Sequence, residues 1–247
     1  MDLELGRMMI DSLELASDDT VVEIGPGLGV LTAEIVKRAV EGITVHAVEI
    51  DKRFVDNLKQ AYLEDLNVNI VEGNILDWLP KYNPTTSFKV LGSLPYYITS
   101  PIVHSVVKMH KRPDLCVFLV QKEVAEKIKS VAPDASYLST FIQSFYDVEF
   151  LGVVPRTKFK PEPKVDGGII RFKKRTNALI LDDQMEKYEG FLHRGFASPR
   201  KMLNKVFSRE ELVASGLDGN LRPQNLSADT WAEVFKTLWN QKTEKKY

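Results

Sequence analysis

The segment VVEIGPGLGVLT, residues 21–32, constrains the fold of this chain more than any other feature. Its first residues are apolar and β-branched, which predicts a strand, and the apolar residues after the glycines predict a helix. Gly25, Gly27 and Gly29 allow the backbone to turn sharply and to approach a ligand closely. Free N–H groups at the start of the helix would point at an anionic group of that ligand. The segment therefore predicts a strand, a ligand-binding loop and a helix in direct succession.

The same alternation of short apolar runs and amphipathic stretches continues through the first 175 or so residues. It predicts an α/β fold, a Rossmann-like open sheet of seven strands with helices on both faces. The expected strands are 21–24, 44–48, 68–71, 89–92, 116–120, 148–153 and 167–172. The expected helices are 31–39, 52–62, 101–109 and 122–130. Too few residues separate the last two strands for a crossover helix, so we expect them to be antiparallel neighbours.

After Arg175 the periodicity becomes helical, which places a domain border near residue 176. We therefore expect an α/β domain over residues 1–176 and a small, all-helical, basic domain over residues 177–247. Its expected helices are 184–196, 199–207 and 228–239. Ser198 before Pro199 has the form of an N-cap followed by proline at the first helical position.

Composition narrows the compartment and the partner. The single cysteine, Cys116, excludes a disulfide framework and fits a reduced, cytoplasmic location. No apolar run reaches the ~20 residues that span a bilayer, so we expect no membrane contact. The net charge of −1 hides a segregation: residues 156–210 hold 14 basic and 7 acidic side chains, whereas residues 1–155 hold 14 and 22. Such segregation is typical of polyanion binding, although a solvated surface also produces it.

Residues at the ends of the second and third strands add to the expected cofactor site. Glu49 ends the second strand, where an acid accepts hydrogen bonds from both ribose hydroxyls of an adenosine group. Ile50 is placed to pack on one face of an adenine. Asn74 and Ile75 follow the third strand, where Asn74 could bond the edge of the adenine and Ile75 could cover its other face. A dinucleotide fingerprint requires a third glycine where Val30 stands, which disfavours a nicotinamide or flavin cofactor.

The fourth strand ends in GSLPYYITSPI, where a proline fixes the backbone and the aromatic after it offers a face to a base. With this element the sequence resembles the small-subunit ribosomal RNA adenine N6-dimethyltransferase family. The matching segments are VVEIGPGLGVLT, AVEID, LPYYITSPI, FLVQKEVAEKI, YLSTFIQ, VPRTKFKPEPKVDGGIIRF, GFASPRKMLNKVF and LRPQNLSADTWAEVF. Large-subunit macrolide-resistance methyltransferases share the fold and the N/S-[IL]-P-Y element, but QKEVA, PKVD and the helical tail favour the small-subunit group.

The resemblance implies S-adenosylmethionine as cofactor and N6-methylation of adenines near the 3′ end of small-subunit ribosomal RNA, in an assembling subunit. It implies that Gly25, Glu49, Asn74 and Ser93 bind the cofactor. It also implies that the target adenine is surrounded by Ser93, Leu94, Pro95, Tyr96 and Phe159. Tyr96 and Phe159 would stack the flipped base, and the Leu94 carbonyl and Ser93 side chain would accept hydrogen bonds from its amine. For each aromatic taken alone, core packing is the more frequent role.

Three departures from the family pattern bear on activity. Ser93 stands where the family has Asn or Asp, so one donor replaces the two of an amide. Asn74 stands where the family usually has Asp, which reverses the match to the adenine amine unless the amide oxygen faces it. Family members usually carry a Gln-x-Phe-Leu-type segment before the first helix, whereas this sequence begins within or just before that helix, through truncation or as a trait of the lineage. Water exclusion from the site would be poorer without such a segment.

The basic stretch supplies the expected RNA contacts, with a solvated flank as the alternative. The candidates are Arg156, Lys158, Lys160, Arg200, Lys201 and Lys205. Lys201 and Lys205 would share one face of the helix expected over 199–207. Two other functions stay open, a ribosome-assembly factor with weakened catalysis and, less favoured, a dehydrogenase. We expect a monomer, since the sequence has neither a heptad seam nor an obvious apolar patch. We also expect no metal ion.

Overall fold

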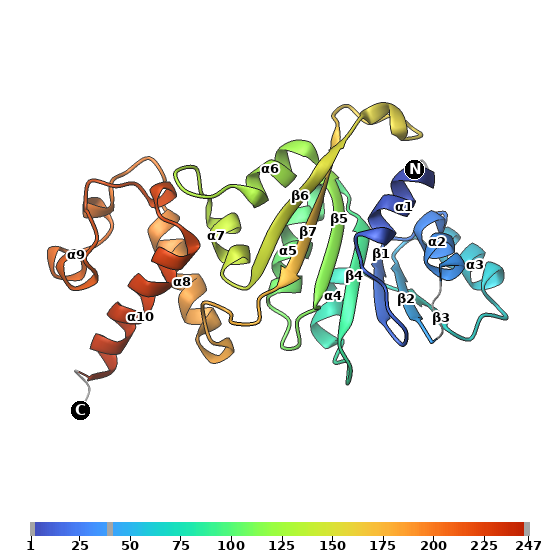
Figure 1. The fold of residues 1–247 in the computed structure, drawn as a ribbon, viewed down its shortest axis with the longest axis horizontal. Helices are drawn as coiled ribbons and strands as arrows, with labels where there is room; N and C mark the ends of the chain where they lie inside the picture. Colours follow the sequence, from blue (N-terminus) through green and yellow to red (C-terminus); the bar gives the residue numbers. More distant parts are fainter. Residues whose placement is uncertain (1–2, 39–41, 245–247) are drawn as a thin grey trace. The chain divides into compact units, whose positions relative to one another are not determined.

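The computed structural model describes residues 3–38 and 42–244, apart from the side chains of Tyr96 and residues 240–244. The chain forms two compact units (Figure 1). Unit 1 comprises residues up to 126 together with 148–174, and unit 2 comprises 127–147 together with residues from 175 onward. The predicted domains, 1–176 and 177–247, differ from these units mainly in residues 127–147.

Unit 1 is built on a seven-stranded sheet in the order β3-β2-β1-β4-β5-β7-β6. The strands are β1 Thr20–Ile24, β2 Thr44–Glu49, β3 Val68–Glu72, β4 Phe88–Ser93, β5 Leu115–Gln121, β6 Tyr146–Val154 and β7 Gly167–Lys174. The first five pair in parallel, and β7 pairs antiparallel with β5. The sheet class and all seven strands are confirmed, and β6 and β7 are neighbours as expected. The chain reverses its direction of travel across the sheet between β1 and β4, which is where open α/β sheets bind ligands.

Helices precede, join and follow the parallel strands of unit 1, and the last of them continues into unit 2 (Figure 1). They are α1 Leu3–Asp11, α2 Val30–Lys37, α3 Lys52–Ala61, α4 Ile75–Trp78, α5 Thr99–Val107 and α6 Lys122–Lys129. One core cluster packs α1 and α2 onto the sheet, through Met9, Ile35, Val117 and Ile169, all of them fully buried. β5 is buried along nearly its whole length because elements cover both of its faces. Cys116 lies in this strand and is buried, and burial raises the pKa of its thiol.

Unit 2 is helical, with α7 Tyr137–Gln143, α8 Met185–Phe196, α9 Arg209–Ser215 and α10 Ala228–Glu244. Residues 127–147 belong to it because their side chains bond to α8. The buried hydroxyls of Ser144 and Tyr188 lie 2.8 Å apart, and Tyr137 Oη donates to Glu189 Oε1 at 3.2 Å. Trp231 on α10 is fully buried, and a Cβ on Gly195 would lie 2.4 Å from its ring. These long-range contacts are invisible to local sequence periodicity.

The predicted helix over 199–207 is wrong. Only a single 3₁₀ turn, Leu203–Lys205, forms there, and Met202 before it is extended with ψ 155°. The backbone N–H groups of Leu203 and Asn204 donate to the carbonyls of Leu221 and Gly219, at 2.8 and 2.9 Å. Because a distant segment takes these donors, the helical ladder does not form. Ser198 is therefore no helix cap, and Lys201 and Lys205 do not share a helix face.

Candidate active site

Residues predicted to bind a cofactor follow the carboxyl ends of neighbouring parallel strands. Ile24 of β1 is level with Val48 of β2 and with Gly92 of β4. Glu49 and Glu72 are level at the ends of β2 and β3, and the Gly73 N–H donates to the Glu49 carbonyl at 2.8 Å. This register brings Gly25, Glu49, Asn74 and Ser93 to one edge of the sheet. Local sequence had placed each of them at a strand end, and the parallel pairing collects them.

The glycine loop between β1 and α2 adopts a conformation that side chains resist. Gly25, Gly27 and Gly29 have φ values of +64°, +55° and +75°, in the left-handed region that favours glycine. A Cβ on Gly25 or Gly27 would meet nothing within 4 Å, so open space lies over both residues. A Cβ on Gly29 would lie 2.7 Å from the Leu58 side chain. The first two glycines therefore leave room for a ligand, while the third allows close packing against α3.

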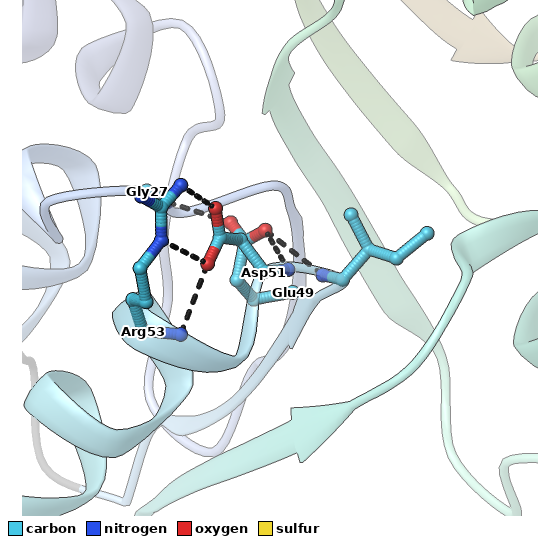
Figure 2. Close-up of polar contacts among 5 residues, drawn as sticks. Gly27, Glu49, Asp51 and Arg53 are labelled. Atoms are coloured by element: carbon cyan, nitrogen blue, oxygen red, sulfur yellow. Dashed lines mark hydrogen bonds and ion pairs between the residues drawn. The ribbon is translucent and has the colours of Figure 1, made fainter.

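The Glu49 carboxylate is buried and held by backbone donors of two loops. Its Oε2 accepts from the Gly27 N–H at 3.0 Å, and its Oε1 accepts from Ile50 N–H and Asp51 N–H at 2.8 and 2.9 Å (Figure 2). A carboxylate offers about four lone-pair positions, so about one is left, on Oε2. Glu49 thus ties the glycine loop to the end of β2 and keeps acceptor capacity for a hydroxyl. Ile50 beside it has 70% of its surface exposed.

The turn after Glu49 is closed by Asp51 and Arg53 (Figure 2). Asp51 caps α3 by accepting from the Arg53 N–H at 2.9 Å, and the Arg53 guanidinium bonds the same carboxylate at 3.0 and 2.6 Å. These bonds to Arg53 lower the pKa of Asp51. An exposed pair of this kind adds little stability by itself. Its effect is to fix the backbone that presents Glu49 and Ile50.

Asn74 is the N-cap of α4, and its Oδ1 accepts from the Leu76 N–H at 3.0 Å. Because a backbone N–H can only donate, the oxygen of the amide must face it. The NH₂ group is therefore the part of Asn74 that remains for a ligand. Ile75, the first residue of α4, is buried in the protein, so of the two isoleucines predicted at the adenine only Ile50 is exposed.

Glu23, a buried acid near the end of β1, was not among the predicted site residues. Its Oε2 accepts from Thr32 Oγ1 at 2.6 Å, and its Oε1 has no hydrogen-bond partner within the described residues. Burial raises the pKa of Glu23 from its ordinary 4.5 to about 7, against the Thr32 hydrogen bonds, and the Glu49 charge adds to the rise. The signal was present in the sequence, because an acid interrupts the apolar run VVEIG directly before the glycine loop.

A separate pocket of about 260 Å³ lies where β4 ends. Three of its lining residues, Ser93, Leu94 and Pro95, belong to the predicted reacting segment, and Phe159 lines it from the segment between β6 and β7. The structure thus brings together four of the five residues predicted around a target base. Leu119, Val120, Pro161 and Pro163 complete the lining and were not predicted. The side chain of the fifth residue, Tyr96, lies outside the described part of the structure.

The backbone at this pocket is fixed by bonds that leave one carbonyl available. The Leu94 N–H donates to the Leu119 carbonyl at 2.9 Å. The Pro95 carbonyl accepts from the Ile98 N–H at 3.2 Å and from Thr99 Oγ1 at 3.1 Å. No hydrogen bond within the described residues uses the Leu94 carbonyl. An oriented, unused acceptor therefore lies beside Ser93.

The six predicted RNA-contacting cations are all exposed. In unit 1, Arg156 pairs with Glu162 at 2.9 Å and Lys158 pairs with Glu4 at 3.5 Å. In unit 2, Arg200, Lys201 and Lys205 lie on the irregular segment that replaces the expected helix. The described residues contain no cluster of His, Cys, Asp and Glu able to hold a metal ion, and none of their helices is long and apolar enough to cross a bilayer.

Comparison with known proteins gives matches over nearly the whole chain. The profile of a family described as "Ribosomal RNA adenine dimethylase" matches residues 5–240. Ribosomal RNA small subunit methyltransferase A of Persephonella marina is 32% identical over 231 residues, covering 93% of this chain and 86% of that protein. The protein of the same name from Listeria innocua is 31% identical over 269 residues, covering 99% and 90%.

Two solved structures resemble the whole fold. The 23S rRNA methyltransferase ErmE superposes with a TM-score of 0.77 at 27% identity, covering 96% of this chain and 98% of its own. A dimethyladenosine transferase from Plasmodium falciparum superposes with a TM-score of 0.81, covering 97% and 96%. Its identity of 21% supports the fold alone.

Proposed function

The chain belongs to the ribosomal RNA adenine dimethylase family, and from that premise we propose how its own residues carry out the reaction. The activity is S-adenosylmethionine-dependent N6-methylation of adenine in small-subunit ribosomal RNA, with dimethylation as the family outcome. The observation that carries the residue assignment is the adjacency of two features at one edge of the sheet. One is the glycine loop tied to Glu49, and the other is the pocket at Ser93–Pro95.

The residues present fit an adenosyl cofactor. Open space lies over Gly25 and Gly27, and the carboxylate of Glu49 retains about one acceptor position for a ribose hydroxyl. The Asn74 NH₂ group is a donor suited to a ring nitrogen of adenine, and Ile50 offers an exposed apolar face for the ring. When bound, S-adenosylmethionine supplies a methyl group on a cationic sulfur. We propose that these five residues would orient that methyl group toward the pocket at Ser93.

In that pocket the target adenine would pack against Phe159 and Pro95 after leaving its base stack. The Leu94 carbonyl and the Ser93 hydroxyl accept hydrogen bonds from the N6 amine and draw its lone pair out of the ring. With the amine held in this way, the bound cofactor would supply the methyl group to N6, and the nitrogen would release one proton to water. Positioning and electrostatic stabilisation supply the rate, without a strong general base.

The test is transfer of labelled methyl groups to small ribosomal subunits that lack the modification. We expect incorporation at N6 of adenine near the 3′ end, and much less with Glu49→Ala, which removes the ribose acceptor. Glu72→Ala, at the exposed end of β3, is the matched control and should behave as wild type. Tight subunit binding with no incorporation would instead support an assembly factor with lost catalysis. Incorporation only into large subunits would support a macrolide-resistance-type enzyme.

Replacing Ser93 by Asn asks how much the departure at this position matters. Higher activity in Ser93→Asn would mean that the hydroxyl is a weaker substitute for an amide. Unchanged activity would mean that the Leu94 carbonyl carries most of the positioning.

We further propose that the exposed cations of both units bind phosphates of an assembling subunit. A monomeric state and a cytoplasmic location stay predictions.

A further inference from the structure

Tyr97 is the only exposed residue among the Phe, Tyr and Trp side chains that the structure describes. It has 84% of its surface exposed, whereas the other described Phe, Tyr, Trp residues are buried or half-buried. No hydrogen bond or ring contact of its side chain is found within the described residues. An exposed ring two residues after the pocket residue Pro95 keeps its apolar face available for a contact.

The backbone under this ring is fixed even though the ring is unengaged. Tyr97 is the middle residue of the 3₁₀ turn Tyr96–Ile98, which leads directly into α5. The Pro95 carbonyl accepts two hydrogen bonds, from the Ile98 N–H and from Thr99 Oγ1. The turn is therefore anchored on both sides of Tyr97. A ring on such a turn loses little conformational entropy when a flat ligand binds it.

The position of the turn indicates which kind of ligand would contact the Tyr97 ring. Pro95 lines the pocket at Ser93, and Tyr97 follows it by two residues on the solvent side of the same turn. A nucleotide that places its base in this pocket leaves its two neighbours outside, unstacked from it. Unstacked bases in single-stranded RNA bind to exposed aromatic faces. We propose that Tyr97 stacks the base of a nucleotide next to the target adenine and so positions the RNA strand at the pocket.

This inference rests on the proposed function, because it takes the pocket at Ser93 to be the adenine site. The experiment compares Tyr97→Ala, Tyr97→Gln and Tyr97→Phe in methylation of an RNA hairpin that carries the target adenines. We expect Tyr97→Ala and Tyr97→Gln to raise KM for RNA by about 10- to 100-fold, the usual effect of losing one stacked base. Tyr97→Phe keeps the ring and should match wild type, as should Leu66→Ala, an exposed residue 93% accessible on the loop before β3.

A base-free nucleotide separates stacking from a general effect on folding or on the RNA. When the hairpin lacks the base on one side of the target adenine, the KM of wild type for RNA should rise by the same factor as the Tyr97→Ala substitution causes on the intact hairpin. The KM of Tyr97→Ala should not rise further on that base-free hairpin. The inference would be overturned if the effects of Tyr97→Ala and of the missing base on KM multiplied, whichever side of the target lacked the base. An unchanged KM in Tyr97→Ala would overturn it too. Cofactor affinity, measured by calorimetry, should stay at the wild-type value in every Tyr97 variant.

A binding assay keeps this outcome distinct from failure of the proposed function. 2-Aminopurine placed beside the target adenine should lose fluorescence when the hairpin binds wild type or Tyr97→Phe, and keep it with Tyr97→Ala. This readout needs no methyl transfer. If the hairpin binds and is quenched but not methylated, the proposed function fails while the stacking role stands. Quenching that is equal in wild type and Tyr97→Ala would overturn the stacking role.

Discussion

Replacing Glu23 by Gln should change how the stability of the protein depends on pH. The Glu23 carboxyl is fully buried, and burial raises its pKa from 4.5 to about 7. An acid with a raised pKa in the folded state contributes its full stability below pH 4.5, where folded and unfolded chains are both protonated. Between pH 4.5 and about 7 only the unfolded chain ionises, so stability falls.

The size of the fall follows from the shift. A pKa difference of about 2.5 units corresponds to about 3 kcal/mol of unfolding free energy lost between pH 4.5 and 7. Glutamine keeps an oxygen that accepts from Thr32 Oγ1 and stays neutral at every pH. Its buried NH₂ group costs on the order of 1–3 kcal/mol, but that cost does not depend on pH. The stability of Glu23→Gln relative to wild type should therefore rise by about 3 kcal/mol from pH 4.5 to pH 8.

Urea unfolding of the cofactor-free protein, followed by circular dichroism at half-unit pH steps, measures this difference. Cofactor must be absent because a bound ligand adds its own stability. Glu72→Gln, with an exposed carboxyl at the end of β3, is the control and should run parallel to wild type. If the Glu23→Gln profile also runs parallel to wild type, within about 0.5 kcal/mol, the account of Glu23 as a buried neutral acid is wrong.

Three further changes have directions that the structure sets. Asn74→Asp should tighten S-adenosylmethionine binding by about tenfold in calorimetry, because one carboxylate oxygen can cap Leu76 while the other accepts from the adenine amine; equal affinity would contradict this. Gly29→Ala should lower the unfolding free energy by roughly 1–3 kcal/mol in urea melts, since its φ is +75° and Leu58 lies 2.7 Å from the added Cβ. Neutralising three cations of unit 2, Arg200, Lys201 and Lys205, should reduce the slope of log Kd for RNA against log salt concentration by about 2, as measured by filter binding. An unchanged slope would mean that these cations do not contact the RNA.

Sequence alone could predict the sheet and the cofactor edge because both depend on local signals. The apolar strand, the glycines and the acid at Glu49 each follow from neighbouring residues, and parallel pairing then brings strand ends together without further information. The donors that hold Glu49 were not predictable in the same way. The Gly27 N–H of the glycine loop donates to Glu49 at the end of β2, and the sequence of neither segment alone predicts that bond.

The errors and omissions are non-local. The stretch 199–207 has helical periodicity and a proline at its start, but the backbone of Leu203 and Asn204 pairs with residues 219–221. Residues 127–147 belong to unit 2 because Ser144 and Tyr137 bond to side chains of α8, far along the chain. Phe159 joined the predicted site only through the family resemblance, since no spacing relates it to Ser93. Contacts between distant segments overrode the helical preference of 199–207 and drew 127–147 into unit 2, and such a contact also brings Phe159 to Ser93.

The backbone at the proposed adenine pocket bears on what Ser93 would do in methylation. The proposed acceptor for the adenine amine is the Leu94 carbonyl, a group that every residue type supplies. Its direction is set by the Leu94 N–H bond to Leu119 and by the rigid Pro95 that follows. Neither restraint involves the side chain at position 93, so a change there alters one hydrogen bond to the substrate and leaves the carbonyl in place. We therefore expect residue 93 to tune the methylation rate, and the main chain of Leu94 and Pro95 to decide whether methylation occurs.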